Sequence, residues 1–242
     1  LYKKMKSILN IILFFIDFGH KNKIIKFFKD QYYKKNLIVI DVGAHIGETI
    51  SLFSKNFNIK KMICYEASKI NFNKLSKFNN LNNLNIVINN IALGSKEKEL
   101  EFFQTSESSS STFCKIDHNS DYFKRKKNIL NIFHRAEYIV NSELIKLKTL
   151  ENEFIKYNLE YVDILKIDTE GFEFDVIKGA GDKIKLIKFI LFEHHYDQMI
   201  VKNYKFSEIN QYLIKLNFRK IIKFKMPFRK TFEYIYINEC LK

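Results

Sequence analysis

Short runs of apolar residues alternate with amphipathic stretches from residue 37 onward. The apolar runs are typical of strands buried on both faces, and the stretches between them have the spacing of helices. We predict strands over Leu37–Asp41, Lys61–Glu66, Asn85–Ala92, Tyr161–Asp168 and Leu186–Glu193, and helices over Glu48–Asn56, Ser68–Phe78 and Phe172–Lys178. Strands separated by single helices require right-handed crossovers. The pattern therefore predicts a doubly wound α/β domain.

The carboxyl end of the chain has a different pattern. A helix is predicted over Ser207–Leu216, and two extended runs follow over Phe218–Lys225 and Thr231–Asn238. The runs flank Pro227, the single proline of the chain, and two strands so close in sequence form a hairpin. We therefore expect a mostly parallel seven-strand sheet with an antiparallel C-terminal hairpin.

Periodicity is weak between the third and fourth predicted strands. Residues 95–105 alternate enough to predict a small additional strand, but residues 106–145 contain a polar run over Ser108–Ser111 and a charge cluster over Lys124–Lys127. Ligands bind at the carboxyl edge of such sheets. We therefore expect residues 106–145 to form an insertion or lid over that edge.

Residues 1–36 precede the first predicted strand and are expected to form an N-terminal helical extension. Residues 8–18 are apolar apart from Asn10 and Asp17, but this run is too short to cross a bilayer and has no small-residue cleavage site. We interpret it as a helix packed on the domain and expect a cytoplasmic protein. A helix on the membrane surface, with peripheral contact through residues 1–20, is the alternative.

Charge and cysteine content argue against several classes of protein. The chain has 41 Lys and Arg against 27 Asp and Glu, a net charge of +14, yet only four of its residues are Arg. Because the lysines are dispersed and Arg is the residue suited to phosphate forks, we expect no nucleic-acid partner. The three cysteines form no Cys-x-x-Cys pair, which disfavours a disulfide framework or a zinc ribbon.

A glycine-containing turn follows the first predicted strand, in Asp41-Val-Gly-Ala-His-Ile-Gly-Glu48. Gly43 permits a tight turn with a ligand against bare backbone, and Gly47 lets the next helix begin close to the strand. The turn lacks the glycine spacing of a dinucleotide site and the lysine of a phosphate loop. Asp41 would instead attract an amine, and Glu66 is placed to accept both hydroxyls of a ribose. An adenosyl group with a positive amino-acid tail fits both carboxylates.

Several short motifs together resemble the serial motifs of FkbM-type methyltransferases, over about residues 37–195. They are Asp41–Thr49, Tyr65–Ala67, Asn90–Gly94, Ser109–Thr112, Thr149–Glu151, and Asp163–Gly171 through Ile177–Ala180. The resemblance implies a Rossmann-like class I methyltransferase fold over residues 37–242 and S-adenosyl-L-methionine as the cofactor. It also implies transfer of a methyl group to a hydroxyl.

The resemblance assigns the cofactor-binding residues one by one. It places Asp41, Gly43, Ala44 and Gly47 around the methionine part, Glu66 at the ribose, and Asn90 and Ile91 near the adenine. Ala67, next to Glu66, is a further expected cofactor-binding residue. His45 stands where the family commonly has Asn, which puts one polar contact of the turn in doubt.

Methyl transfer from a sulfonium requires an aligned acceptor and removal of its proton. The groups expected beside the cofactor's sulfur follow the fourth and fifth strands and are Asp168, Glu170, Glu193, His194 and His195. The favoured base is His194 or His195, because imidazole titrates near neutrality. Alternation along a strand lets only one of the two face the cleft easily. The alternative is that Asp168 or Glu170 caps a helix and one histidine lies in the core.

The same nitrogen and oxygen donors are compatible with magnesium, manganese or zinc. Their spacing matches no recognised ligand code, so a divalent metal is an alternative that we do not expect.

We interpret the chain as an S-adenosylmethionine-dependent O-methyltransferase, with a sugar or glycoconjugate precursor as the favoured small-molecule acceptor. An NAD-dependent oxidoreductase is one alternative, although it should have the other glycine spacing. A non-catalytic cofactor-binding or scaffold protein is another, although Asp41, Gly43, Gly47 and Glu66 argue against it. The sequence indicates neither the methylated position nor the oligomeric state.

Overall fold

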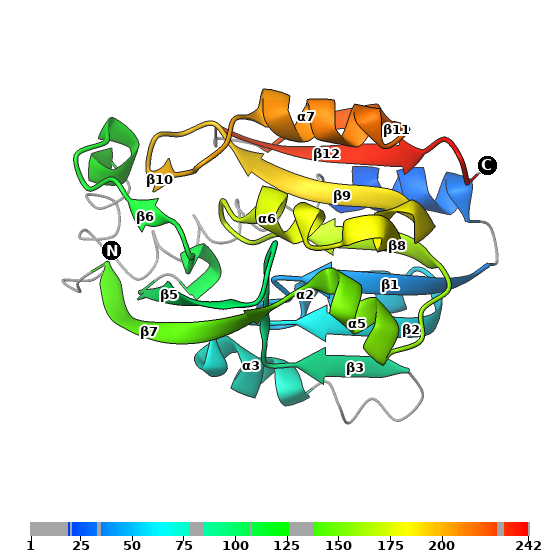
Figure 1. Cartoon of the computed structure of the whole chain (residues 1–242), viewed down its shortest axis with the longest axis horizontal. Helices are drawn as coiled ribbons and strands as arrows, with labels where there is room; N and C mark the ends of the chain where they lie inside the picture. The colour runs from blue at the N-terminus through cyan, green and yellow to red at the C-terminus, as the bar shows by residue number, and fades with distance from the viewer. Residues whose placement is uncertain are drawn as a thin grey trace, which may run out of the picture.

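A seven-stranded sheet forms the centre of the molecule (Figure 1). The computed structural model describes residues 19, 21–32, 35–77, 85–106, 108–125, 138–226 and 230–241. The strands, in sheet order, are β11 (Phe218–Lys225), β12 (Thr231–Asn238), β9 (Ile187–His195), β8 (Val162–Ile167), β1 (Asn36–Val42), β2 (Asn58–Tyr65) and β3 (Ile86–Asn89). Strands β3, β2, β1, β8 and β9 run parallel, whereas β12 runs antiparallel to both of its neighbours.

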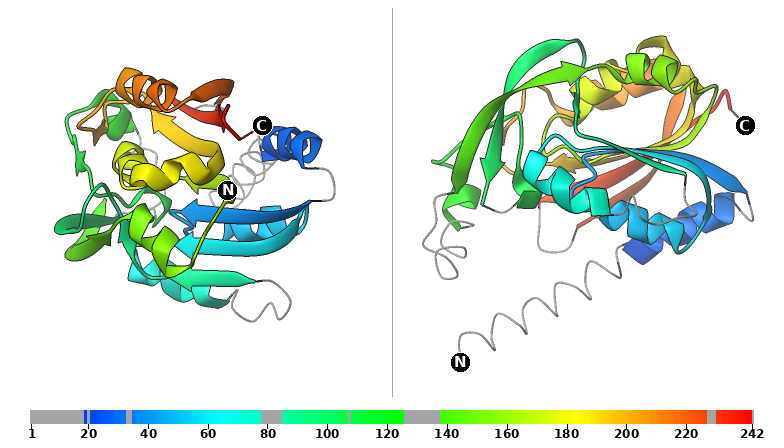
Figure 2. Two further views of the ribbon diagram at one scale, coloured as in Figure 1. Left: turned by 45° about the vertical axis from the view of Figure 1, so that its right-hand side comes forward. Right: turned by 90° about the horizontal axis from the view of Figure 1, so that it is seen from below.

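Helices cover both faces of this sheet (Figure 2). Helical residues 21–31 pack on one face with α2 (Glu48–Ser54) and α3 (Lys69–Leu75), and the opposite face carries α5 (Leu150–Lys156), α6 (Glu173–Lys178) and α7 (Phe206–Lys215). The alternation of β9 divides its side chains between two hydrophobic cores: Phe189 and Leu191 belong to the first face, and Ile190 and Phe192 to the second. Burial on both faces explains the continuous apolar runs in the sequence.

The described part of the predicted N-terminal extension packs against the sheet. Phe28 of helical residues 21–31 is fully buried, and its ring lies 5.6 Å from that of Phe189 on β9, measured between centroids. The apolar run over residues 8–18 lies outside the described residues. Within the described ranges, no helix is both long and apolar enough to span a membrane. The domain division at residue 37, the cytoplasmic location and the membrane contact stay predictions.

The strand predicted over residues 85–92 is two strands in two sheets. Beyond β3 the Asn90 side chain donates hydrogen bonds to the carbonyl oxygens of Glu66 and Ala67, at 2.8 and 3.1 Å, so the chain leaves the main sheet there. The next strand, β4 (Ala92–Leu93), joins β7 (Ile139–Lys148) and the predicted β5 (Lys98–Thr105) in a separate three-stranded sheet.

Strand β7 occupies part of the region predicted as an irregular insertion. Its residues are mostly exposed, which explains why no apolar pattern indicated a strand. Between β5 and β7, the chain forms the short strand β6 (Lys115–Ile116), which pairs with β10 (Ile200–Val201) beyond β9. The inserted residues are therefore joined to the loop after β9. A lid function for residues 106–145 stays a prediction.

Two glycines let the end of α6 approach the loop after β4. A Cβ on Gly179 would lie 2.1 Å from the carbonyl oxygen of Gly94. Because this oxygen belongs to the backbone, it cannot move away easily. Gly179→Ala should therefore lower the free energy of unfolding by about 2–3 kcal/mol, measured by urea denaturation. Gly19→Ala is the matched control, because a Cβ there meets nothing within 4 Å. Equal stability of Gly179→Ala and the native chain would contradict this close approach.

Candidate active site

A cavity of about 730 Å³ lies at the carboxyl ends of β1, β2, β8 and β9. Most of the residues predicted from the sequence line it: Gly43, Ala44, His45, Glu66, Ala67, Ile91, Asp168, Glu170, Glu193 and His195. The predicted residues that do not line it are Asp41, Gly47, Asn90 and His194. The topology thus brings the two predicted groups, for cofactor and for catalysis, to one cavity.

Glu66 is held at the end of β2 by backbone donors. Its Oε1 accepts a hydrogen bond from the Ser68 amide at 2.9 Å, and its Oε2 accepts one from the His45 amide at 2.8 Å. Burial raises the pKa of Glu66 to about 7, although these hydrogen bonds favour the carboxylate. His45 therefore supports Glu66 through its backbone, while its ring Nδ1 lies 2.9 Å from Glu48 Oε1.

Asn90 and Gly47 act through backbone geometry. The two hydrogen bonds from the Asn90 side chain fix the carbonyls of Glu66 and Ala67. Gly47 is the N-cap residue directly before α2, with a φ of 98° that glycine adopts without strain. Of the predicted adenine neighbours, only Ile91 lines the cavity itself.

Gly43 is required by protein packing. Its φ is +84°, and a Cβ there would lie 1.8 Å from the carbonyl oxygen of Asp168. The sequence interpretation attributed the missing side chain to the approach of a ligand. The structure adds a packing reason, because the backbone after β8 fills the position that a side chain would need. The approach of a ligand to Gly43, which lines the cavity, stays a prediction.

Lys166 is a site residue that the sequence interpretation missed. Its ammonium lies 3.4 Å from Asp41 Oδ1 and 3.3 Å from Asp168 Oδ2, and it lines the cavity. Although burial disfavours the charged form, Asp41 and Asp168 hold the pKa of Lys166 well above its usual value. Asp41 itself is fully buried and lies opposite Lys166 in the register of β1 and β8. The sequence feature that could have indicated Lys166 is the presence of a lysine within the apolar run of β8.

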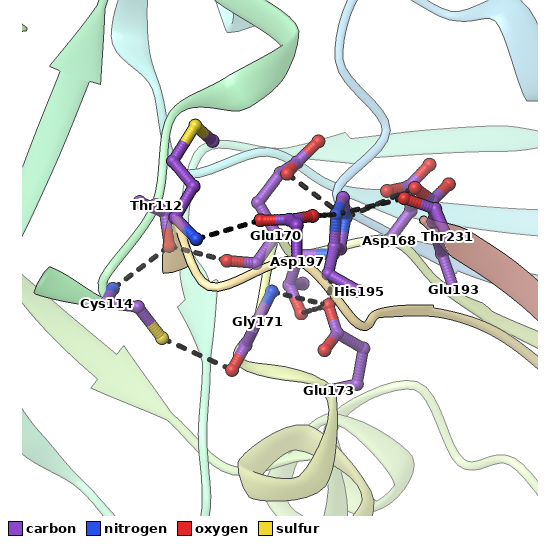
Figure 3. A network of polar contacts seen from close by, with 12 residues as sticks. Thr112, Cys114, Asp168, Glu170, Gly171, Glu173, Glu193, His195, Asp197 and Thr231 are labelled. Atoms are coloured by element: carbon purple, nitrogen blue, oxygen red, sulfur yellow. Dashed lines mark hydrogen bonds and ion pairs between the residues drawn. The ribbon is translucent and has the colours of Figure 1, made fainter. Parts of the chain in front are cut away.

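His195 lies among carboxylates at the end of β9 (Figure 3). Its Nε2 is 3.2 Å from both Glu170 Oε2 and Glu193 Oε1, and its Nδ1 is 3.3 Å from Asp197 Oδ2. Thr231 Oγ1 is 3.2 Å from the same Nδ1. Burial disfavours the imidazolium, but the carboxylates of Glu170, Asp197 and Glu193 raise the pKa of His195 well above its usual value.

His194 points to the other face of β9. Its ring packs against Tyr196, Tyr204 and Phe206, with centroid distances of 4.8, 5.8 and 5.6 Å. Burial lowers the pKa of His194 to about 3, so the ring is neutral at physiological pH. The two histidines are separated by strand alternation, and His195 is the one on the cavity.

The loop after β8 is held in place by two further residues that the sequence did not indicate as site residues, Thr112 and Glu173. Glu170 has a φ of 51°, unusual for a residue with a side chain, and Thr112 Oγ1 donates a hydrogen bond to its carbonyl at 2.7 Å. The buried Glu173 accepts hydrogen bonds from the amides of Thr169 and Gly171, at 3.2 and 2.9 Å. The Ser109–Thr112 motif could have indicated Thr112. For Glu173, the sequence shows only an acidic residue at the start of a predicted helix.

The sequence model of the FkbM methyltransferase domain matches residues 41–220 of the chain. The chain belongs to the FkbM methyltransferase family. The enzyme class and the cofactor expected from the sequence, a methyltransferase that uses S-adenosylmethionine, are thereby confirmed. The match begins at Asp41, before the glycine turn, and includes the loops after β8 and β9.

Solved structures of other methyltransferases are similar to this FkbM methyltransferase. Magnesium protoporphyrin IX methyltransferase from Synechocystis is 9% identical with a TM-score of 0.46, and the match covers 91% of this chain and 79% of that chain. TrmK from M. capricolum, in complex with S-adenosyl-homocysteine, is 10% identical with a TM-score of 0.49 and coverages of 91% and 68%. The ribosomal protein L11 methylase from Lactobacillus delbrueckii is 12% identical with a TM-score of 0.45 and coverages of 90% and 78%. The comparison with curated protein sequences found no match.

Glu66→Ala should weaken binding of S-adenosylhomocysteine by about 2 kcal/mol, roughly 30-fold, because a charged hydrogen-bond acceptor is lost. The pKa of Glu66 is raised to about 7, so in the native enzyme the affinity should also fall as the pH is lowered through 7 and Glu66 becomes protonated. Calorimetric titrations between pH 6 and pH 8 measure both effects. The variant retains His45, so a pH dependence that persists in Glu66→Ala would assign the effect elsewhere. Glu160→Ala, an exposed residue, is the control.

Proposed function

We propose that this FkbM methyltransferase transfers the methyl group of S-adenosylmethionine to a hydroxyl of a small molecule, with a sugar or glycoconjugate precursor as the favoured acceptor. The observation that supports this proposal is one cavity lined both by Glu66 and by Asp168, Glu170, Glu193 and His195. The cofactor occupies the end formed by the loops after β1 and β2. The acceptor enters at the end formed by β8 and β9.

The cofactor is oriented by groups along the first part of the cavity. Glu66 accepts the ribose hydroxyls, Ala67 and Ile91 flank the adenine, and the backbone of Gly43 and Ala44 faces the methionine part. His45 contributes the amide that holds Glu66. Asp41 acts indirectly through its ion pair with Lys166, whose ammonium is a suitable partner for the cofactor's carboxylate.

The reaction is a displacement at the methyl carbon. The acceptor oxygen forms a bond to this carbon, the carbon–sulfur bond breaks, and sulfur keeps the electron pair as a neutral thioether. The hydroxyl proton is released to solvent. Asp168, Glu170, Glu193 and His195 hold the hydroxyl in line with the carbon–sulfur bond, and this alignment is the main contribution that the protein can make.

A polyhydroxyl acceptor suits this end of the cavity better than a phosphate backbone. Hydroxyl groups donate hydrogen bonds to carboxylates, whereas the carboxylates of Asp168, Glu170 and Glu193 repel an anion. That the enzyme has no nucleic-acid partner stays a prediction from the sequence. The acceptor's identity within the class of hydroxyl compounds is open to experiment.

Calorimetric titration with S-adenosylhomocysteine and with NAD tests the cofactor half of the proposal. We expect one molecule of S-adenosylhomocysteine per chain and no binding of NAD. Binding of NAD alone would support the oxidoreductase alternative, and binding of neither would support the scaffold alternative. Transfer of a labelled methyl group to sugar nucleotides, glycans, RNA and protein then tests the acceptor, and labelling of RNA or protein alone would contradict the proposed class.

The two neighbouring histidines should differ in their effect on methyl transfer. His195→Gln should lower kcat/KM by on the order of 100-fold, because His195 lies on the cavity among the acceptor-side carboxylates. His194→Phe, placed among aromatic rings on the opposite face, should keep the activity within about threefold. The affinity for S-adenosylhomocysteine, measured by calorimetry, verifies that each variant is folded. Equal activities of the two variants would refute the role of His195.

A further inference from the structure

Three side chains, two from the end of β9 and one from the loop after β8, converge on one point of the cavity. One ligand atom each from Glu170, Glu193 and His195 lies within 4.8 Å of the others. His195 Nε2 is 3.2 Å from a carboxylate oxygen of each glutamate. Ligands bound to one cation at about 2.1 Å lie roughly 3.0–3.4 Å apart, so the two distances from His195 Nε2 match a shared cation.

The orientation of the His195 ring favours coordination at Nε2. This atom is buried and, among the described residues, has no partner with hydrogen-bond geometry. The opposite nitrogen, Nδ1, is anchored by Asp197 and Thr231, at 3.3 and 3.2 Å (Figure 3). Metal-binding histidines usually donate their second ring nitrogen to a carboxylate in this way. Asp197 is thus positioned to orient His195 as a metal ligand.

The charge around the three residues also favours a cation. Glu193 is buried, and it lies opposite Glu233 in the register of β9 and β12. Lys166 is already placed between Asp41 and Asp168. Carboxylates that are removed from water need a compensating positive charge. The Lys202 ammonium donates a hydrogen bond to the His195 carbonyl at 2.7 Å and also acts on Asp197, so a protonated His195 would add one positive charge beside Glu170 and Glu193.

We propose that Glu170, Glu193 and His195 bind a divalent cation. The sequence left a metal as an unexpected alternative, and the geometry of these residues now favours it. One imidazole nitrogen with carboxylate oxygens suits Mn²⁺ or Zn²⁺ better than Ca²⁺. The role of the cation rests on the proposed function: it binds the acceptor oxygen and favours loss of the hydroxyl proton. The site itself does not depend on that role.

Binding of Mn²⁺ to the full chain, after treatment with a chelator and its removal, tests the site. The free Mn²⁺ signal in electron paramagnetic resonance should fall with one ion bound per chain. Glu193→Gln and His195→Gln should each weaken binding at least tenfold, whereas His194→Phe should bind as the native chain does. Glu170→Gln provides a third ligand variant, in the loop after β8. Calorimetry with S-adenosylhomocysteine verifies the fold of every variant.

Two results would overturn the proposal. One is the absence of Mn²⁺ and Zn²⁺ binding up to millimolar concentration in a chain that binds S-adenosylhomocysteine, which would leave protonated His195 as the partner of the carboxylates. The other is Mn²⁺ binding of equal strength in Glu193→Gln, His195→Gln and the native chain. A chain that binds Mn²⁺ through these residues but does not bind S-adenosylhomocysteine would support the metal site and reject the proposed function.

Discussion

The Lys166 ammonium lies between the carboxylate of Asp41, which is fully buried, and that of Asp168, which is partly exposed at the cavity. Such charges are tolerated only when they are paired, since an unpaired buried charge costs several kcal/mol. The register of β1 and β8 places Asp41 opposite Lys166, so strand pairing and the ion pair depend on each other. The same two strands are joined beyond the ion pair, where the Asp168 amide donates a hydrogen bond to the Val42 carbonyl at 2.9 Å. The ion pair and this hydrogen bond therefore hold the loop after β1 and the loop after β8 in fixed positions relative to each other.

The backbone of both loops is conformationally unusual. Gly43 and Gly47 in the first loop, and Gly171 in the second, have positive φ, and so do the non-glycine residues His45 and Glu170. A positive φ at a residue with a side chain costs of order 1 kcal/mol and persists only where the surroundings enforce it. Here the His45 amide is bound by the Glu66 carboxylate, and the Glu170 carbonyl is bound by Thr112. Hydrogen bonds to polar side chains thus help to maintain these backbone conformations.

Much of the fold could be predicted because its strands are buried on both faces and therefore read as apolar runs. The mostly exposed β7 gave no such run, and the break after β3 depends on hydrogen bonds from Asn90 to another loop. Within the site, Glu66 could be predicted because it stands at the end of a predicted strand. Lys166, Thr112 and Glu173 act through contacts with residues on other elements or within a folded loop, which spacing alone does not reveal. The choice between His194 and His195 depends on which face of β9 meets the cavity, and the sequence alone does not show this.

The change from hydrophobic core to active site occurs at the same level on three neighbouring strands. On one face of the sheet, Val39, Ile164 and Leu191 belong to the core, and two residues further along each strand stand Asp41, Lys166 and Glu193. The charges at this boundary interact in a medium of low dielectric constant. Carboxylates beside a sulfonium would stabilise the reactant more than the transition state, in which sulfur loses its positive charge. A cation held by Glu170, Glu193 and His195 would offset this effect, because it compensates the carboxylates without moving during the reaction. The negative charge at this end of the cavity is therefore consistent with a bound positive charge, which the cation proposed at Glu170, Glu193 and His195 would supply.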